Sequence, residues 1–180
     1  MFAYQVDEHI QLRQLEPRFA EDLFQLIDRN RTYLREWLPW VDGTLSPKDT
    51  SHFIQLTLNQ IAANNGFQTG IFYQGVIAGC IGLHRIDWGN QKTSIGYWLA
   101  AEFQGRGIMT KACKAMIDHI FNELELNRVE IRAAVKNRKS RAIPERLGFT
   151  QEGTIRRAEW LYDHYVDHVV YGLLKEEWVE

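Results

Sequence analysis

A turn that contains two glycines is the part of the chain best suited to bind an anion. Gly105 and Gly107 flank Arg106 directly before residues 108–125, whose apolar side chains recur at helical spacing. Glycines this close together let the backbone turn tightly and approach a ligand. The first turn of the following helix has unpaired N–H groups and the positive end of the helix dipole, to which Arg106 adds charge. We therefore predict a diphosphate site at residues 104–110.

Other glycine-rich anion sites fit this turn less well. No Gly-Lys-Ser/Thr sequence follows, so the turn is not a P-loop. The dinucleotide pattern G-x-G-x-x-G is nearly met, but Thr110 stands at the third glycine and only one strand–helix–strand unit is visible. A tight turn without a ligand and a site for the diphosphate of coenzyme A both stay open on this motif alone.

Alternation and helical spacing indicate the elements that position this turn. Strands are expected at residues 9–15, 67–73, 76–86, 93–99, 128–135, 149–157 and 165–174. Helices are expected after Pro17 and over residues 46–63, 108–125 and 140–147. The long helix makes strands 93–99 and 128–135 parallel, whereas the hairpins are antiparallel. We expect one α/β domain over residues 1–180, a mixed α+β arrangement in which helices cover both faces of one sheet.

The composition excludes several classes of protein. With 180 residues, of which 45% are hydrophobic and 24% charged, the chain has the make-up of one globular domain. A net charge of -2 argues against nucleic acid as a partner, and no long apolar stretch is present to cross a membrane. The first residues lack a signal-peptide pattern and the two cysteines have no CxxC spacing, so we expect a cytoplasmic protein.

The order of these motifs resembles the GNAT acetyltransferase superfamily. Its phosphate loop, Gln/Arg-x-x-Gly-x-Gly/Ala, is matched by Gln104 and Gly107, with Met109 at the last position. Residues 76–82 look like the family's second hairpin strand, and residues 137–140 and 145–149 look like its later cofactor segment. Residues 35–40 and 95–99 are similar to the RimL/RimJ-type branch, which acetylates the N-terminal amines of ribosomal proteins. The resemblance covers most of the chain.

The resemblance implies a mostly antiparallel sheet whose two central parallel strands splay apart at their C-terminal ends, with acetyl-CoA bound in the gap. The backbone of Tyr97, Trp98 and Leu99 would pair with the pantetheine, and an N–H group there would polarise the thioester carbonyl. Asn137 would also contact the pantetheine. The implied contacts in the phosphate loop are Gln104, Gly105, Arg106, Gly107, Ile108, Met109 and Thr110.

A basic run follows the expected strand 128–135. Its members are Lys136, Arg138, Lys139 and Arg141. Such a run either holds the 3′-phosphate of coenzyme A or is a solvated face, and the sequence leaves both open.

The acid–base pair that is commonest in the family is missing from this chain. Many members use a Tyr seven residues after the motif Asn and a Glu five residues before it, where this chain has Pro144 and Arg132. In the RimL-like branch the proposed acid and base are a Ser and a Glu, which correspond to Ser140 and Glu159. Ser140 is equally suited to cap the helix that it begins, and Glu159 to pair with a surface cation.

Aromatic residues are expected to wall the acceptor site. Trp37, Trp40 and Trp88 are the candidates, against the alternative that each packs in the core. His164 and His168 have a spacing that suits a metal on a helix, but they lie in an expected strand without a third ligand nearby. We therefore expect no metal site.

These features predict an acetyl-CoA-dependent N-acetyltransferase whose acceptor is a primary amine. The resemblance indicates the N-terminal α-amine of a ribosomal or other protein as that acceptor. Two alternatives stay open: acetylation of a small amine, such as a polyamine, an antibiotic or an amino acid, and a non-catalytic module that binds acetyl-CoA. We expect no direct contact with nucleic acid or a membrane, and the sequence leaves open whether the chain forms a homo-oligomer.

Overall fold

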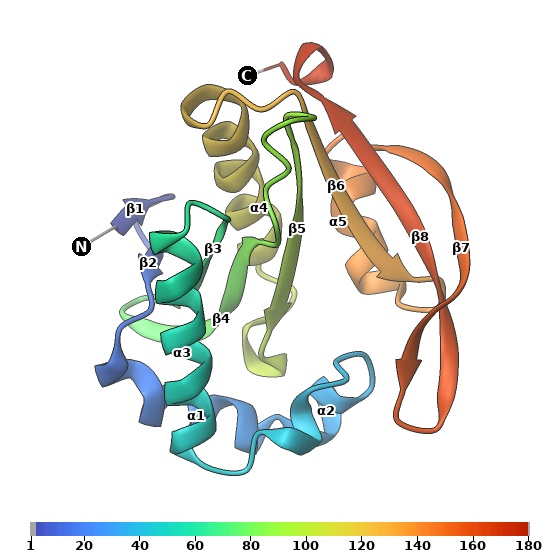
Figure 1. Ribbon diagram of the computed structural model, residues 1–180. Helices are drawn as coiled ribbons and strands as arrows, with labels where there is room; N and C mark the ends of the chain where they lie inside the picture. Colours follow the sequence, from blue (N-terminus) through green and yellow to red (C-terminus); the bar gives the residue numbers. More distant parts are fainter. Residues whose placement is uncertain (1–2, 180) are drawn as a thin grey trace.

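An eight-stranded mixed sheet forms the centre of the computed structural model, which describes residues 3–179 (Figure 1). The strands lie in the order β1-β2-β3-β4-β5-β6-β8-β7, and only β5 and β6 run parallel among these described neighbours. The strands are β1 (Ala3–Gln5), β2 (Ile10–Gln14), β3 (Phe67–Tyr73), β4 (Val76–Leu83), β5 (Lys92–Leu99), β6 (Arg128–Ala134), β7 (Thr150–Leu161) and β8 (His164–Leu174). The helices are α1 (Ala20–Arg29), α2 (Arg31–Arg35), α3 (Pro47–Ala62), α4 (Ile108–Asp118) and α5 (Arg138–Arg146). Residues 1, 2 and 180 of the expected domain lie outside the described part.

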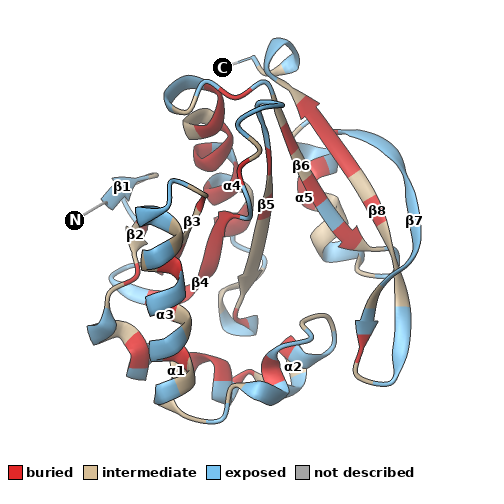
Figure 2. Cartoon of the chain, viewed as in Figure 1, coloured by how far each residue is buried: buried red, intermediate tan, exposed pale blue. Residues whose placement is uncertain are grey.

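Two hydrophobic cores, one on each face of the sheet, hold the helices in place. On one face, α1 and α3 pack on a core that includes Phe72 and Ile77. On the other face, α4 and α5 pack on a core that includes Ile71, Ile81 and Ile131. Successive side chains of a strand point to opposite faces, which is why adjacent residues of β3 belong to different cores. Figure 2 shows buried residues along β4, β6 and α4, and the prediction of helices on both faces is confirmed.

Turn residues set the register of the β3–β4 hairpin. Tyr73 faces Val76 across a two-residue turn. Gln74 and Gly75 both have positive φ angles, 50° and 81°, which is the backbone that two-residue hairpins favour. The prediction of a strand at residues 67–73 is confirmed, whereas the strand expected at residues 76–86 ends at Leu83.

The parallel strands β5 and β6 separate about halfway along their length. Their pairing begins with Lys92 and Arg128 and ends with Ile95 and Ile131. Beyond this point β5 stays beside β4 up to Leu99, while β6 stays beside β8. The expected splay is therefore confirmed, and it opens a wedge between the C-terminal ends of the two strands.

The helix expected at residues 140–147 begins earlier, at Arg138. Its N-cap is Asn137, whose side-chain oxygen accepts a hydrogen bond from the backbone N–H of Ser140 at 3.2 Å. The interpretation of Ser140 as the cap is therefore wrong. Asn is as good a cap as Ser, and at this position its side chain reaches an N–H group of the first turn.

Strand β7 continues to Leu161, past the expected end at residue 157. The pairing with β8 shifts between Ile155 and Glu159, and Arg157 within this bulge has a φ of 49°. A bulge bends its strand and increases the local twist. In Figure 1 the far half of the β7–β8 hairpin turns toward the segment that follows α2.

Helix α4 is shorter than the expected helix over residues 108–125. It ends at Asp118, and residues His119–Glu123 continue it as one turn of π-helix. Among residues 3–179, no helix has the length and apolar content needed to span a bilayer.

Candidate active site

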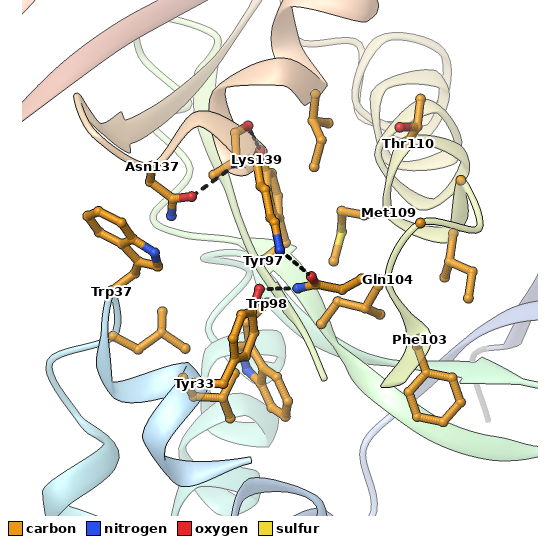
Figure 3. Close-up of a pocket in the computed structure, with 18 of the residues that line it drawn as sticks. Tyr33, Trp37, Tyr97, Trp98, Phe103, Gln104, Met109, Thr110, Asn137 and Lys139 are labelled. Atoms are coloured by element: carbon orange, nitrogen blue, oxygen red, sulfur yellow. Dashed lines mark hydrogen bonds between the residues drawn. The ribbon is translucent and has the colours of Figure 1, made fainter. Parts of the chain in front are cut away.

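A cavity of about 530 Å³ lies at the C-terminal end of β5 (Figure 3). Three parts of the chain enclose it: the start of α4, one face of α5, and the segment around α2. Its lining residues are Tyr33, Leu34, Trp37, Leu38, Tyr97, Trp98, Leu99, Phe103, Gln104, Gly105, Gly107, Ile108, Met109, Thr110, Asn137, Lys139, Ser140, Ile143 and Arg146. The structure therefore brings the expected glycine turn, strand residues 97–99, Asn137 and Ser140 to one site.

The glycine turn has the backbone that an anion site requires. Gly105 and Gly107 have φ angles of 73° and 71°, and Gly107 is the N-cap of α4. A Cβ atom built on either glycine would meet no heavy atom within 4 Å, so open space borders the turn. The first N–H groups of α4 cannot bond within the helix, and they lie where the turn lines the cavity. These features fit a diphosphate.

Arg106, the expected cation of this turn, does not line the cavity. Its Nη2 donates to the carbonyl oxygen of Glu102 at 3.3 Å, and its guanidinium lies 5.6 Å from the ring centroid of Tyr73. The positive charges that line the cavity come from α5, namely Lys139 and Arg146. The resemblance placed residues 145–149 in a cofactor segment but gave Arg146 no role of its own. Its spacing of seven residues from Lys139, which places both on one helix face, is the signal that could have found it.

Gln104 links three parts of the site. Its side-chain nitrogen donates a short hydrogen bond to the hydroxyl of Tyr33, which belongs to α2. Its side-chain oxygen accepts a hydrogen bond of 3.1 Å from Nζ of Lys139 on α5. Figure 3 shows this chain of contacts running across the cavity. Gln104 thus ties the turn before α4 to both walls of the site.

Ser140 is held by Tyr97. The Tyr97 hydroxyl donates to the backbone carbonyl oxygen of Ser140 at 2.9 Å, and Oγ of Ser140 lies 3.4 Å from the same hydroxyl. Desolvation by burial raises the pKa of Tyr97 far above its usual value, so this hydroxyl keeps its proton at any ordinary pH. The Ser140 hydroxyl lines the cavity in a position fixed by a neutral neighbour.

Glu159 lies outside the cavity lining, on the other face of the sheet. Its Oε1 is 3.8 Å from Nε2 of His168, and His168 faces Ala134 in the β6–β8 pairing. Residues 132 and 134 share a strand face, whereas Ile131 of β6 packs in the core beneath α4 and α5. Glu159 and Ser140 therefore lie on opposite faces of the sheet. Sequence analysis did not connect His168 with Glu159.

The three candidate tryptophans occupy three different places. Trp37 lines the cavity. The ring of Trp40 lies outside the lining but 5.9 Å from the ring of Trp98, which does line it. Trp88 precedes β5 and donates from its indole nitrogen to the carbonyl oxygen of Asn64 at 2.8 Å, so the length of β5 separates it from the cavity. The structure does not bring Trp88 to the site, and its role there is corrected.

The tip of the β7–β8 hairpin is fastened to the segment that carries Trp37. The hydroxyl of Tyr162 donates a short hydrogen bond to the carbonyl oxygen of Leu38, and the guanidinium of Arg35 lies 3.7 Å from the Tyr162 ring centroid. Two hydrogen bonds, of 2.7 and 2.9 Å, hold Arg35 to Asp42. These contacts, which the sequence did not predict, place the tip of this hairpin beside a segment that lines the cavity.

This arrangement can bind a long phosphorylated carrier and present its end to an acceptor. The N-terminal end of α4 suits the phosphates, and Ser140 and the C-terminal residues of β5 line the same cavity. The described residues contain no cluster of three or more His, Cys, Asp or Glu side chains placed to hold a metal ion. Fold and site together define an acetyl-CoA-dependent N-acetyltransferase.

Comparison with known proteins establishes the family. The chain belongs to the GNAT acetyltransferases, since the family model described as "Acetyltransferase (GNAT) domain" matches residues 9–150. It is 47% identical over 180 residues to Bacillus subtilis YdaF, whose name carries a proposed assignment as a ribosomal N-acetyltransferase, and the match covers 99% of this chain and 98% of YdaF. It is 34% identical to the ribosomal-protein-serine acetyltransferase of Escherichia coli, with 93% of each chain covered.

Solved structures support the same fold and carrier. RimL, a ribosomal L7/L12 α-N-protein acetyltransferase in complex with coenzyme A, superposes with a TM-score of 0.94 at 28% identity, covering 98% of this chain and 99% of RimL. The microcin C7 self-immunity acetyltransferase MccE, in complex with acetyl-CoA and AMP, superposes with a TM-score of 0.90 at 31% identity, covering 94% of each chain. The expected co-substrate, acetyl-CoA, is thereby confirmed at the level of the family.

Proposed function

We propose that this protein acetylates the N-terminal α-amine of a protein, with ribosomal proteins as the leading class of acceptor. The observation that supports the proposal is that Ser140 lines the cavity while Glu159 lies on the opposite face of the sheet, next to His168. The names of the relatives point the same way.

The proposed roles of the residues follow from the chemistry of acyl transfer. Acetyl-CoA supplies the activated acetyl group as a thioester. Glu159 accepts a proton from the amine through water, which is a modest task because a free α-amine has a pKa of about 8. An N–H group of Tyr97, Trp98 or Leu99 donates to the thioester oxygen as negative charge develops there. The amine nitrogen attacks the thioester carbon, and the carbon–sulfur bond breaks as the tetrahedral intermediate collapses. Ser140 gives a proton to the departing sulfur and regains one from water.

The remaining contacts complete the proposed site. Asn137 binds the pantetheine, and the phosphate contacts come from the turn and first residues of α4: Gln104, Gly105, Gly107, Ile108, Met109 and Thr110. Trp37 walls the acceptor site, with Trp40 supporting it through Trp98. We further propose a cytoplasmic location, where ribosomal proteins are available as acceptors.

A second candidate function is acetylation of a small amine. The superposition on MccE, whose complex contains AMP beside acetyl-CoA, favours it. A non-catalytic module that binds acetyl-CoA is the third candidate, because Pro144 and Arg132 stand where many family members carry their acid and base.

A coenzyme A release assay separates these candidates. The panel contains peptides with varied N-terminal residues, the same peptides with blocked N-termini, and free polyamines, antibiotics and amino acids. Release that requires a free peptide N-terminus supports the proposal, with the blocked peptides as the matched control. Turnover of small amines alone would replace it with the second candidate. Binding of acetyl-CoA without release across the panel would establish the third.

A further inference from the structure

We propose that Arg146, at the C-terminal end of α5, binds the diphosphate of coenzyme A from the side opposite to the start of α4. The inference rests on the coenzyme A half of the proposed function and is independent of the acceptor. The phosphate-loop motif and the basic run of residues 136–141 do not include this residue, and the resemblance that places residues 145–149 in a cofactor segment gives Arg146 no contact of its own.

The glycine turn has too little positive charge of its own to balance a diphosphate. A diphosphate linkage brings two negative charges, whereas the start of a helix supplies about half a positive charge. Gln104, at the motif position where Arg is the alternative, is neutral, and Arg106 is directed toward Glu102 and Tyr73. The turn therefore needs a cation from another element.

Arg146 lies beside the first turn of α4. Its Nη1 lies 3.0 Å from Oγ1 of Thr110, the third residue of α4, and both residues line the cavity with Gly105 and Gly107. This contact holds the guanidinium over the first turn of α4, where the free N–H groups are. A guanidinium presents several N–H donors in one plane, which suits the paired oxygens of a phosphate.

No carboxylate of the described residues neutralises the charge of Arg146. Among the described residues no carboxylate lies within ion-pair distance of it, in contrast to Arg141, which lies 3.8 Å from Glu145 on the same helix. A cation at the C-terminal end of a helix is also stabilised by the helix dipole. Arg146 can therefore give its full charge to a ligand.

The orientation of α5 fits this assignment. Lys139, Ile143 and Arg146 line the cavity at spacings of four and three residues, so one face of the helix follows the cavity. Arg146 lies six positions after Ser140, which corresponds to about 9 Å along the helix axis. The helix thus places a candidate acid at the reactive end of the carrier and a cation at its phosphate end.

Calorimetric titration with coenzyme A and with dephospho-coenzyme A tests the proposal. Arg146→Met keeps the length of the side chain but removes its charge, and we expect it to weaken binding of both ligands by the same factor, about ten- to a hundredfold. Arg146→Lys should recover part of this loss. Arg156→Gln, at an exposed position of β7, is the control of equal charge change and should bind like the wild type.

The outcomes distinguish a failure of the role of Arg146 from a failure of the proposed function. Wild-type affinity in Arg146→Met would overturn the inference and leave the acetyltransferase assignment intact. A loss seen with coenzyme A but not with dephospho-coenzyme A would also overturn it, because the guanidinium would then hold the 3′-phosphate. No binding of either ligand by the wild type would instead count against the proposed function itself.

Discussion

The hydroxyl of Tyr97 donates a hydrogen bond to the backbone carbonyl oxygen of Ser140, at 2.9 Å. Pro144 lies four residues after Ser140 and has no N–H group, so it cannot make the usual helical bond to that carbonyl. The tyrosine stands beyond the last β5–β6 pair, Ile95 and Ile131. Its side chain therefore reaches from β5 to α5 and supplies the hydrogen bond that the proline leaves unmade.

Tyr97→Phe should destabilise the fold because it leaves this carbonyl unsatisfied. We expect a loss of about 1–3 kcal/mol in the free energy of unfolding, measured by urea denaturation. In a Pro144→Ala background the helix regains an N–H donor to Ser140, so the same substitution should cost less there. Equal costs in the two backgrounds would show that the proline is not the reason for the tyrosine contact.

Removing either proposed acid–base group should slow the reaction. We expect Ser140→Ala and Glu159→Gln each to lower turnover by more than tenfold in a coenzyme A release assay. Because neither change touches the phosphate turn, the affinity for coenzyme A should stay within a few-fold of wild type. Unchanged turnover in either variant would remove that residue from the proposed mechanism.

Gly107→Ala should weaken cofactor binding through the backbone alone. The φ of Gly107 is 71°, and an added Cβ would meet no neighbouring atom, so the cost is conformational, about 1–2 kcal/mol. The N–H groups at the start of α4 would shift with the turn. Gly75→Ala is the matched control, because its φ is 81°, its Cβ would also meet open space, and it lies in the β3–β4 turn.

Calorimetry and denaturation separate the two alanine variants. Both should lose similar stability, but only Gly107→Ala should lose affinity for coenzyme A. If Gly75→Ala also bound the ligand more weakly, the effect would report a general loss of stability and not the geometry of the phosphate turn.

The stability of the protein in acid should depend on Asp7. A hydrogen bond of 2.6 Å from Nζ of Lys111 is the main cause that lowers the pKa of Asp7 to about 2, and the backbone N–H groups of His9 and Ile10 also donate to this carboxylate. The folded-state pKa lies below the ordinary value of 3.8. The carboxylate therefore stabilises the fold above that pH, and the stabilisation is lost as the pH falls toward 2.

Urea titrations from pH 7 to pH 2 test the role of Asp7. The wild type should be more stable than Asp7→Asn at neutral pH, and the difference should shrink between about pH 4 and pH 2. A difference that stays constant over this interval would mean that the ionisation of Asp7 is not linked to folding.

The sequence predicted turns, helix starts and strand directions that depend on residues within one short segment or on the length of one connection. The hairpin turn at Gln74 and Gly75 follows from residues that tolerate positive φ, and the start of α4 follows from Gly107 before a helical apolar pattern. The parallel pairing of β5 and β6 follows from the long connection between them. The first two depend on neighbouring residues and the third on the length of one connection, and all of these can be read from the sequence.

Features that depend on distant residues could not be predicted in this way. The direction of Arg106 is set by Tyr73, and the place of Arg146 is set by Thr110, 36 residues earlier. The cap of α5 was misjudged because both Asn137 and Ser140 carry a suitable side chain, and only the backbone geometry decides between them.

The short ladder between β5 and β6 has a mechanical consequence. Strands β1–β5 form one leaf of the protein and β6–β8 the other, and the register that joins them runs only from Lys92 and Arg128 to Ile95 and Ile131. A carrier bound in the wedge would contact both α4 and α5, and these contacts would hold the two parts of the sheet together. Occupancy by coenzyme A should therefore raise the melting temperature as its concentration rises above the dissociation constant.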